Sequence, residues 1–282
     1  MKPAVETIHF LGLKFNTLSF EQTLDFFSNC QPGAPFRYFV TPNVQHAVMA
    51  DKDPSQKPSL HAANLSVCDS QPIRMLARLK GHNLPLVTGS DLTMRLFNEV
   101  IQSDDEISVV CASDELKANL IANYPDIKWS IIVPPVGTVL GTDAFDECVS
   151  FIANSKARYT FVCLGAPKSE MMCHIAAQQQ NSTGTALCVG ASLEFMTGNK
   201  KRAPKIIRGS GFEWLYRLIK EPRRLYYRYV SAFLPLLILM IRELKTKTND
   251  AHGPHFNFLL QEMNDKEAHE PDSHSSPDGR LS

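Results

Sequence analysis

An acidic residue and a dense group of cations lie close together between positions 188 and 228. Gly190 ends an apolar run, and four residues later comes Glu194, a carboxylate able to accept hydrogen bonds from a ribose diol. The basic triplet Lys200-Lys201-Arg202 follows, and then a helix-prone aromatic and basic stretch that reaches Arg228. This density of cations favours a phosphorylated ligand met near a membrane surface. A solvated surface position is the alternative for Glu194.

Asp69 is the strongest candidate for a catalytic base. It directly follows the apolar run 64–68 and precedes the turn Ser70-Gln71-Pro72. A carboxylate held at the end of a strand and partly removed from water can take a proton from an attacking hydroxyl. Asp is also a frequent helix N-cap, so capping of the following helix is the alternative role for Asp69.

Two glycine-containing turns could bind an anion. The turn Gly165-Ala166-Pro167-Lys168 opens a predicted helix, whose first backbone N–H groups have no partner within the helix. Gly89-Ser90-Asp91 is similar, although Ser90 or Asp91 could simply cap the next helix. No GxGxxG follows the first strand and no GxxxxGK[ST] occurs, so neither a dinucleotide-binding fold nor a P-loop ATPase is supported. No DxD-like pair is suitably placed for a metal–diphosphate, so we expect metal-independent transfer and no cofactor.

Composition narrows the class of protein. The 282 residues carry a formal net charge of zero, which argues against nucleic acid as a partner. The seven cysteines form no CxxC pair and lie mostly in apolar runs, as is typical of buried thiols in a reducing compartment. The first residues lack the basic start and long apolar stretch of a signal peptide. We therefore expect a cytoplasmic protein.

Short apolar runs alternate with longer amphipathic stretches, which is typical of βαβ units. Because the strands are apolar almost throughout, the sheet should be buried on both faces. The sequence thus predicts a Rossmann-like, doubly wound α/β fold with a mostly parallel sheet. Strands are expected at 37–41, 64–68, 84–88, 107–111, 129–133, 159–164 and 185–189, and helices at 20–29, 44–50, 73–79, 91–101, 114–123, 144–154 and 168–179.

Three units are predicted along the chain: a catalytic core over 1–204, a helical appendage over 205–245 and a disordered polar tail over 246–282. The appendage contains the apolar run 230–241, which is too short to span a bilayer and is flanked by arginines. A helix lying in the membrane interface fits this pattern. Packing on the core, or against a second copy in a homo-oligomer, is the alternative.

The order and spacing of several motifs resemble the WecG/TagA/CpsF-type bacterial glycosyltransferases over roughly 35–229. The matching motifs are Thr41-Pro42-Asn43, Asp69, Val87-Thr88-Gly89-Ser90-Asp91-Leu92, Pro134-Pro135-Val136-Gly137, Gly165-Ala166-Pro167-Lys168-Ser169-Glu170, 190–198, Lys201-Arg202-Ala203-Pro204 and Glu213-Trp214-Leu215-Tyr216-Arg217. The resemblance implies an inverting enzyme that moves a sugar from a UDP-sugar to a polyprenyl-diphosphate-linked sugar. It also implies a peripheral position on the inner face of the cytoplasmic membrane, with the appendage closing over the site.

Site residues follow from the same resemblance. Asp69 matches the proposed catalytic base. The positions that match substrate-binding residues are Thr41, Asn43, Gly89, Ser90, Asp91, Gly165, Lys168 and Ser169. Those that match nucleotide-binding residues are Gly137, Gly190 and Glu194. Arg217, Arg223, Arg224 and Arg228 match appendage arginines that would meet a diphosphate, the group on which negative charge builds as UDP leaves.

The chain departs from the family pattern at several of these motifs. Leu86 stands where an Arg is usual, Ser169 where a Gln is usual, and Glu194 where an Asp is usual. Cys68-Asp69-Ser70 replaces Ala-Asp-Gly around the base. These departures leave a second hypothesis open, a catalytically weakened scaffold protein that binds UDP or lipid in the same pathway.

Overall fold

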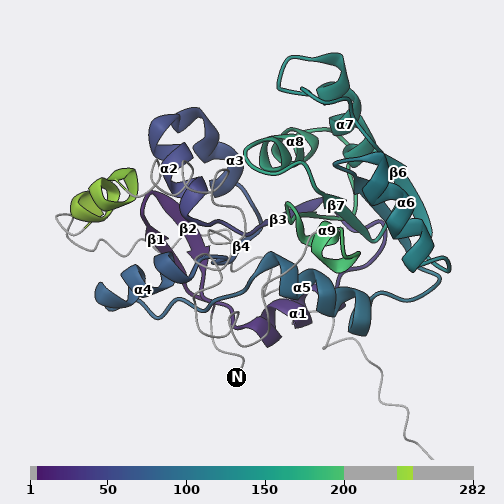
Figure 1. The fold of residues 1–282 in the computed structure, drawn as a ribbon. Helices are drawn as coiled ribbons and strands as arrows, with labels where there is room; N and C mark the ends of the chain where they lie inside the picture. Colours follow the sequence, from purple (N-terminus) through teal and green to yellow (C-terminus); the bar gives the residue numbers. More distant parts are fainter. Residues whose placement is uncertain (1–4, 200–233, 244–282) are drawn as a thin grey trace, which may run out of the picture.

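A six-stranded parallel sheet forms the centre of the protein (Figure 1). The computed structural model describes residues 5–199 and 234–243. The strands lie in the order β4-β3-β8-β7-β5-β6, so β8, the last of the described strands along the chain, pairs with both β3 and β7 in the middle of the sheet. Their bounds are β3 Arg37–Val40, β4 Leu65–Ser66, β5 Glu106–Val110, β6 Lys128–Ile132, β7 Tyr159–Val162 and β8 Thr185–Cys188. The predicted α/β fold with a mostly parallel sheet is confirmed.

Successive residues of a strand point to opposite faces of the sheet, and in these strands most residues on both faces are apolar. Helices therefore cover both faces. Phe161 of β7 points into one core cluster with α1 (Phe20–Ser28), α5 (Gly89–Arg95), α6 (Asp114–Asn123) and α9 (Ser192–Met196). The next residue, Val162, points into the opposite cluster with α7 (Asp143–Ala153) and α8 (Lys168–Ala176). The two helical layers are visible on either side of the strands in Figure 1.

A third core cluster lies beside the β4 edge of the sheet. It is built around an antiparallel hairpin of β1 (Thr7–Phe10) and β2 (Leu13–Asn16). The helices that pack on this hairpin are α2 (Val44–Lys52), α3 (Lys57–His61) and α4 (Gln71–Leu79); the short 3-10 turn η1 (Pro54–Gln56) connects α2 to α3. The hairpin was not predicted. Its turn places Leu11 and Gly12 at φ 51° and 71°, a conformation that a Leu rarely adopts.

The predicted strand 84–88 is wrong. Only an isolated parallel bridge between Leu86 and Cys68 forms there, supported by the bond from the Val87 N–H to the Cys68 carbonyl at 2.9 Å. Pro85 has no N–H to donate to a ladder, which explains why pairing stops. The predicted helix 91–101 begins two residues earlier, at Gly89, and ends in a π-helical turn, η2, over Leu96–Val100.

Residues 234–243 form a helix within the predicted appendage, shown in yellow-green in Figure 1. Leu239 is 7% exposed and packs into the third cluster, with Leu236 beside it. Two polar contacts fasten residues 242 and 243 to the core: Glu243 accepts a hydrogen bond from the Leu11 N–H at 3.0 Å, and Arg242 pairs with Asp51 at 3.0 Å. Its other face exposes Leu234, Leu237, Ile238 and Ile241. Within the described ranges, no helix combines the length and the apolar character needed to cross a membrane.

Candidate functional site

Asp69 lies at the carboxyl end of β4, immediately before α4. The cap of α4 is its neighbour Ser70, whose hydroxyl accepts a hydrogen bond from the Ile73 N–H at 3.3 Å. Capping is therefore not the role of Asp69. Its Oδ2 instead accepts a hydrogen bond from the Gly89 N–H at 3.3 Å, and its own N–H donates to the Pro42 carbonyl at 3.0 Å. These bonds fix the carboxylate between the turns that follow β3 and precede α5.

Gly89 brings three chain segments into close contact. A Cβ at this position would lie 3.2 Å from Thr41 Oγ1, closer than most Cβ contacts, and 3.5 Å from Ser192 Oγ, so a larger residue would displace the Thr41 side chain by a few tenths of an ångström. The cap of α5 is Thr88, which accepts from the Asp91 N–H at 3.2 Å and donates to Asp91 Oδ2 at 2.6 Å. Ser90 or Asp91 was the expected cap of this helix, and that expectation is wrong because Thr88 caps it. Asp69, Thr41 and Gly89 thus meet at one edge of the sheet, as carboxyl ends of parallel strands must.

A series of hydrogen bonds that was not predicted from the sequence holds Asn43. It caps α2 through its side chain, which accepts from the Gln45 N–H at 2.9 Å. Its backbone N–H donates to His46 Nδ1 at 3.2 Å, and the same Nδ1 lies 3.1 Å from Asn43 Oδ1. His46 Nε2 then donates to Glu170 Oε1 at 3.2 Å. The series connects the turn after β3 to the first turn of α8.

The turn after β7 carries Gly165 and Lys168, both partly exposed. Ser169, predicted to contact substrate, is fully buried, and its hydroxyl donates to the Val162 carbonyl at 3.3 Å. Glu170 is 4% exposed, and within the described part of the chain its Oε2 has no hydrogen-bond partner. A small cavity beside Glu170 is lined by His46, Met49, Gln56, Ser59, Leu60, Ala166 and Pro167.

The predicted nucleotide-binding residues are spread along the same edge. Gly190 forms the turn between β8 and α9, and Glu194 lies in the first turn of α9. Burial, with a smaller contribution from the Glu194 carboxylate, raises the pKa of Cys111, which places Glu194 near the end of β5. Gly137 is exposed in the loop after β6, and β6 itself lies five strand spacings, or roughly 24 Å, from β4. A Cβ built at Gly137 would meet no atom within 4 Å, so the loop is open at this position.

The four predicted diphosphate-binding arginines, Arg217, Arg223, Arg224 and Arg228, lie outside the described residues. So do the basic triplet that begins at Lys200 and the predicted tail 246–282. Their assignments stay predictions from the sequence.

One cysteine side chain makes a polar contact beside Asp69: the Cys68 thiol donates to the Ser70 carbonyl at 3.3 Å. All seven are buried and unbridged. Burial raises the pKa of Cys68, the residue before Asp69, to about 12. Among residues 5–199 and 234–243, no group of three His, Cys, Asp or Glu side chains is placed to bind a metal ion.

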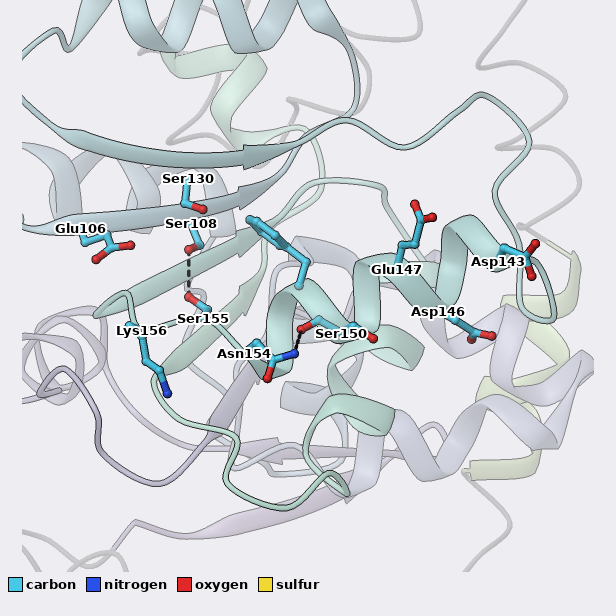
Figure 2. A pocket seen from close by; sticks show the side chains of 11 residues that line it. Glu106, Ser108, Ser130, Asp143, Asp146, Glu147, Ser150, Asn154, Ser155 and Lys156 are labelled. Atoms are coloured by element: carbon cyan, nitrogen blue, oxygen red, sulfur yellow. Dashed lines mark hydrogen bonds between the residues drawn. The ribbon is translucent and has the colours of Figure 1, made fainter.

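A separate open groove of about 660 Å³ lies between α7 and strands β5 and β6 (Figure 2). Its polar wall includes Glu106, Asp146 and Glu147, and Ser108 is hydrogen-bonded to Ser155 at 2.8 Å. Glu106 begins β5, so this groove extends toward the amino ends of the strands. None of its lining residues is a predicted site residue.

One comparison with known proteins bears on the site. The family model described as the glycosyl transferase WecG/TagA/CpsF family matches residues 8–250. The match spans every described strand and helix apart from the first residue of β1, and it includes Asp69, Gly89 and Glu194. The chain therefore belongs to the WecG/TagA/CpsF family of glycosyltransferases, which act in the synthesis of bacterial cell-surface polysaccharides.

Proposed function

We propose that the protein is an inverting, metal-independent glycosyltransferase that moves a sugar from a UDP-sugar to a polyprenyl-diphosphate-linked acceptor. Asp69 is the general base. It takes the proton of the acceptor hydroxyl while that oxygen bonds to the anomeric carbon from the face opposite UDP. The bond between the anomeric carbon and the UDP oxygen breaks at the same time, and UDP leaves with the electron pair.

The position of Asp69 carries this proposal. Ser70 caps α4 in its place, and the bond from the Gly89 N–H holds the Asp69 carboxylate at the carboxyl ends of the strands. In open parallel sheets, ligands bind at that edge. Thr41 and Asn43, which lie between β3 and α2, would contact the acceptor or the transferred sugar.

Charge on the departing diphosphate would be stabilised by the appendage arginines, Arg217, Arg223, Arg224 and Arg228. Guanidinium groups bind phosphate oxygens through paired, charge-assisted hydrogen bonds, so they could take the place of a metal ion. Glu194 and Gly190, at the start of α9, would hold the nucleoside, with Gly137 at the far end of the same edge.

The exposed apolar face of the helix 234–243 supports a peripheral position at the inner face of the cytoplasmic membrane. A chain truncated after Ala203 should accordingly remain folded in its core but transfer sugar poorly to a lipid-borne acceptor. Full activity of that truncated chain would contradict both the membrane role and the arginine roles.

The test is UDP release from a panel of UDP-sugars, with and without a short-chain polyprenyl-diphosphate-sugar. We expect acceptor-dependent release with one donor, and at least about a hundredfold loss in Asp69→Asn with near-normal UDP affinity. Asp146→Asn is the matched control, since this exposed Asp lies on α7 in the separate groove. Normal turnover of Asp69→Asn would remove Asp69 from the mechanism.

The second candidate, a weakened scaffold that binds UDP or lipid, is favoured by one observation. Ser169 replaces a Gln expected to touch substrate, and its hydroxyl is turned inward to β7. UDP binding without release from any donor would favour this candidate over the transferase.

A further inference from the structure

The outer face of α4 is exposed, apolar and basic. Ile73 and Ala77 bury the inner face in the third core cluster. Two positions further along, and therefore about 200° around the helix, Met75 is 60% exposed and Leu79 is 72% exposed. They are four residues apart, so they form one ridge along the helix.

Cations flank this ridge. The stretch from Gln71 to Lys80 contains Arg74, Arg78 and Lys80 and no acidic residue. Arg78 is exposed, and Arg74 and Lys80 are partly exposed. Apolar side chains bordered by Arg and Lys are typical of helices that lie in an anionic membrane interface, where the cations meet phosphate groups.

A second apolar face lies at the same end of the molecule. The helix 234–243 and α4 both pack on the β1–β2 hairpin, the first through Leu239 and the second through Ile73 (Figure 1). The exposed side chains of the helix 234–243 include Leu237 and Ile241. Two helices packed in one core cluster can set an orientation that a single helix cannot.

We propose that α4 is a membrane-docking element whose Met75–Leu79 ridge enters the headgroup layer of an anionic phospholipid bilayer. This inference rests on the proposed function, to which it adds the orientation of the base. Asp69 lies two residues before α4, whereas Met75 and Leu79 lie about 6 Å and 12 Å beyond Gln71 along the helix axis. The carboxylate is thereby held just above the surface that carries a lipid-linked acceptor.

The experiment is co-sedimentation of the full chain with vesicles of phosphatidylcholine and phosphatidylglycerol at about three to one. Leu79→Glu should lower the partition coefficient at least about fivefold, and Met75→Glu/Leu79→Glu should lower it further. Ile121→Glu is the matched control because Ile121 is also an exposed apolar residue, 46% exposed, on a helix at the other end of the sheet. It should bind vesicles as the unaltered chain does. Thermal unfolding of all variants should coincide, since every altered side chain is exposed.

Two results would overturn the proposal. A fall in vesicle binding in Leu237→Glu/Ile241→Glu, with none in the α4 variants, would assign docking to the other helix alone. A dimer that Met75→Glu/Leu79→Glu splits in sedimentation velocity, with vesicle binding unchanged, would assign the ridge to a second copy of the chain.

Activity separates this proposal from the proposed function. The α4 variants should transfer sugar normally to a short-chain acceptor in solution and poorly to an acceptor embedded in vesicles. Vesicle binding that depends on α4, in a chain that transfers no sugar at all, would leave the docking surface standing and remove the transferase. Equal transfer to vesicle-borne acceptor by the variants would remove the docking role.

Discussion

His46 and Glu170, which are 124 positions apart in the chain, form a buried pair, with Nε2 3.2 Å from Oε1. Through the bond from the Asn43 N–H to Nδ1, this pair ties the turn after β3 to the start of α8. Two segments of the candidate site therefore keep their relative position by a polar contact inside the protein.

Loss of this pair should be costly. His46→Ala leaves both carboxylate oxygens of Glu170 buried and unpaired, so we expect the free energy of unfolding to fall by about 1–3 kcal/mol in urea titrations. A double-mutant cycle with Glu170→Gln should give a coupling energy of about 0.5–3 kcal/mol. The surface pair of Arg95 and Glu21 is the control, and its cycle should give less than about 1 kcal/mol. Equal couplings in the two cycles would contradict the structural role of the buried pair.

Gly89→Ala should damage the site more than the fold. The new methyl group would press on Thr41 Oγ1 at 3.2 Å, next to the Asp69 carboxylate. Gly89 is the first residue of α5, so Ala gains less there than the about 1 kcal/mol of a helix interior and offsets the crowding only in part; the free energy of unfolding should fall slightly. We expect kcat/KM for sugar transfer to fall about tenfold. Unchanged kinetics would show that the contact between Gly89 and Thr41 has no bearing on the reaction.

Leu239→Ala should loosen the attachment of the helix 234–243. Leu239 is its buried contact with the third cluster, and truncation of a buried Leu costs about 2 kcal/mol or more. Amide hydrogen exchange should become faster in 234–243 and at the turn around Leu11, whose N–H donates to Glu243. Leu237→Ala, at a 42% exposed position on the same helix, should leave exchange unchanged. Identical exchange in both variants would mean that packing of Leu239 does not hold the helix.

The thiols should be inert in the native protein. Burial raises the pKa of Cys68 from 9.0 to about 12, and all seven cysteines are buried. A thiol reagent at pH 8 should modify none of them before unfolding and all seven afterwards. Because the native pKa lies above the unfolded one, this group stabilises the fold fully below about pH 9, and the contribution is lost as pH rises toward 12. Rapid labelling of Cys68 at pH 8, without loss of structure, would contradict this.

The sequence predicted the central strands well and the edge less well. Runs such as 107–111 and 159–164 are apolar almost throughout. This pattern is typical of strands in a sheet that helices cover on both faces. At 84–88 the same apolar signal was misleading because Pro85 interrupts pairing. The hairpin at β1 and β2 escaped because its turn places Leu11 at positive φ.

The site was predictable in part. Strand ends located Asp69 and Gly89, but Asp69 and Ser70 are both good caps, so the sequence could not tell which one caps α4. His46 had one local signal, its place three residues after the cap Asn43, where a capping-box partner stands. Its partner Glu170 follows from the tertiary fold alone, since no local pattern relates residues 124 positions apart.

The central place of β8 has a consequence for biogenesis. β3 and β7 each pair with β8 and not with one another, so the sheet consists of two separate halves until β8 is in place. On the ribosome, about two thirds of the chain must be synthesised before that happens, and until then the facing edges of both halves offer unpaired N–H and C=O groups. Nascent chains that stall before Thr185 should consequently depend on chaperones to avoid edge-to-edge aggregation.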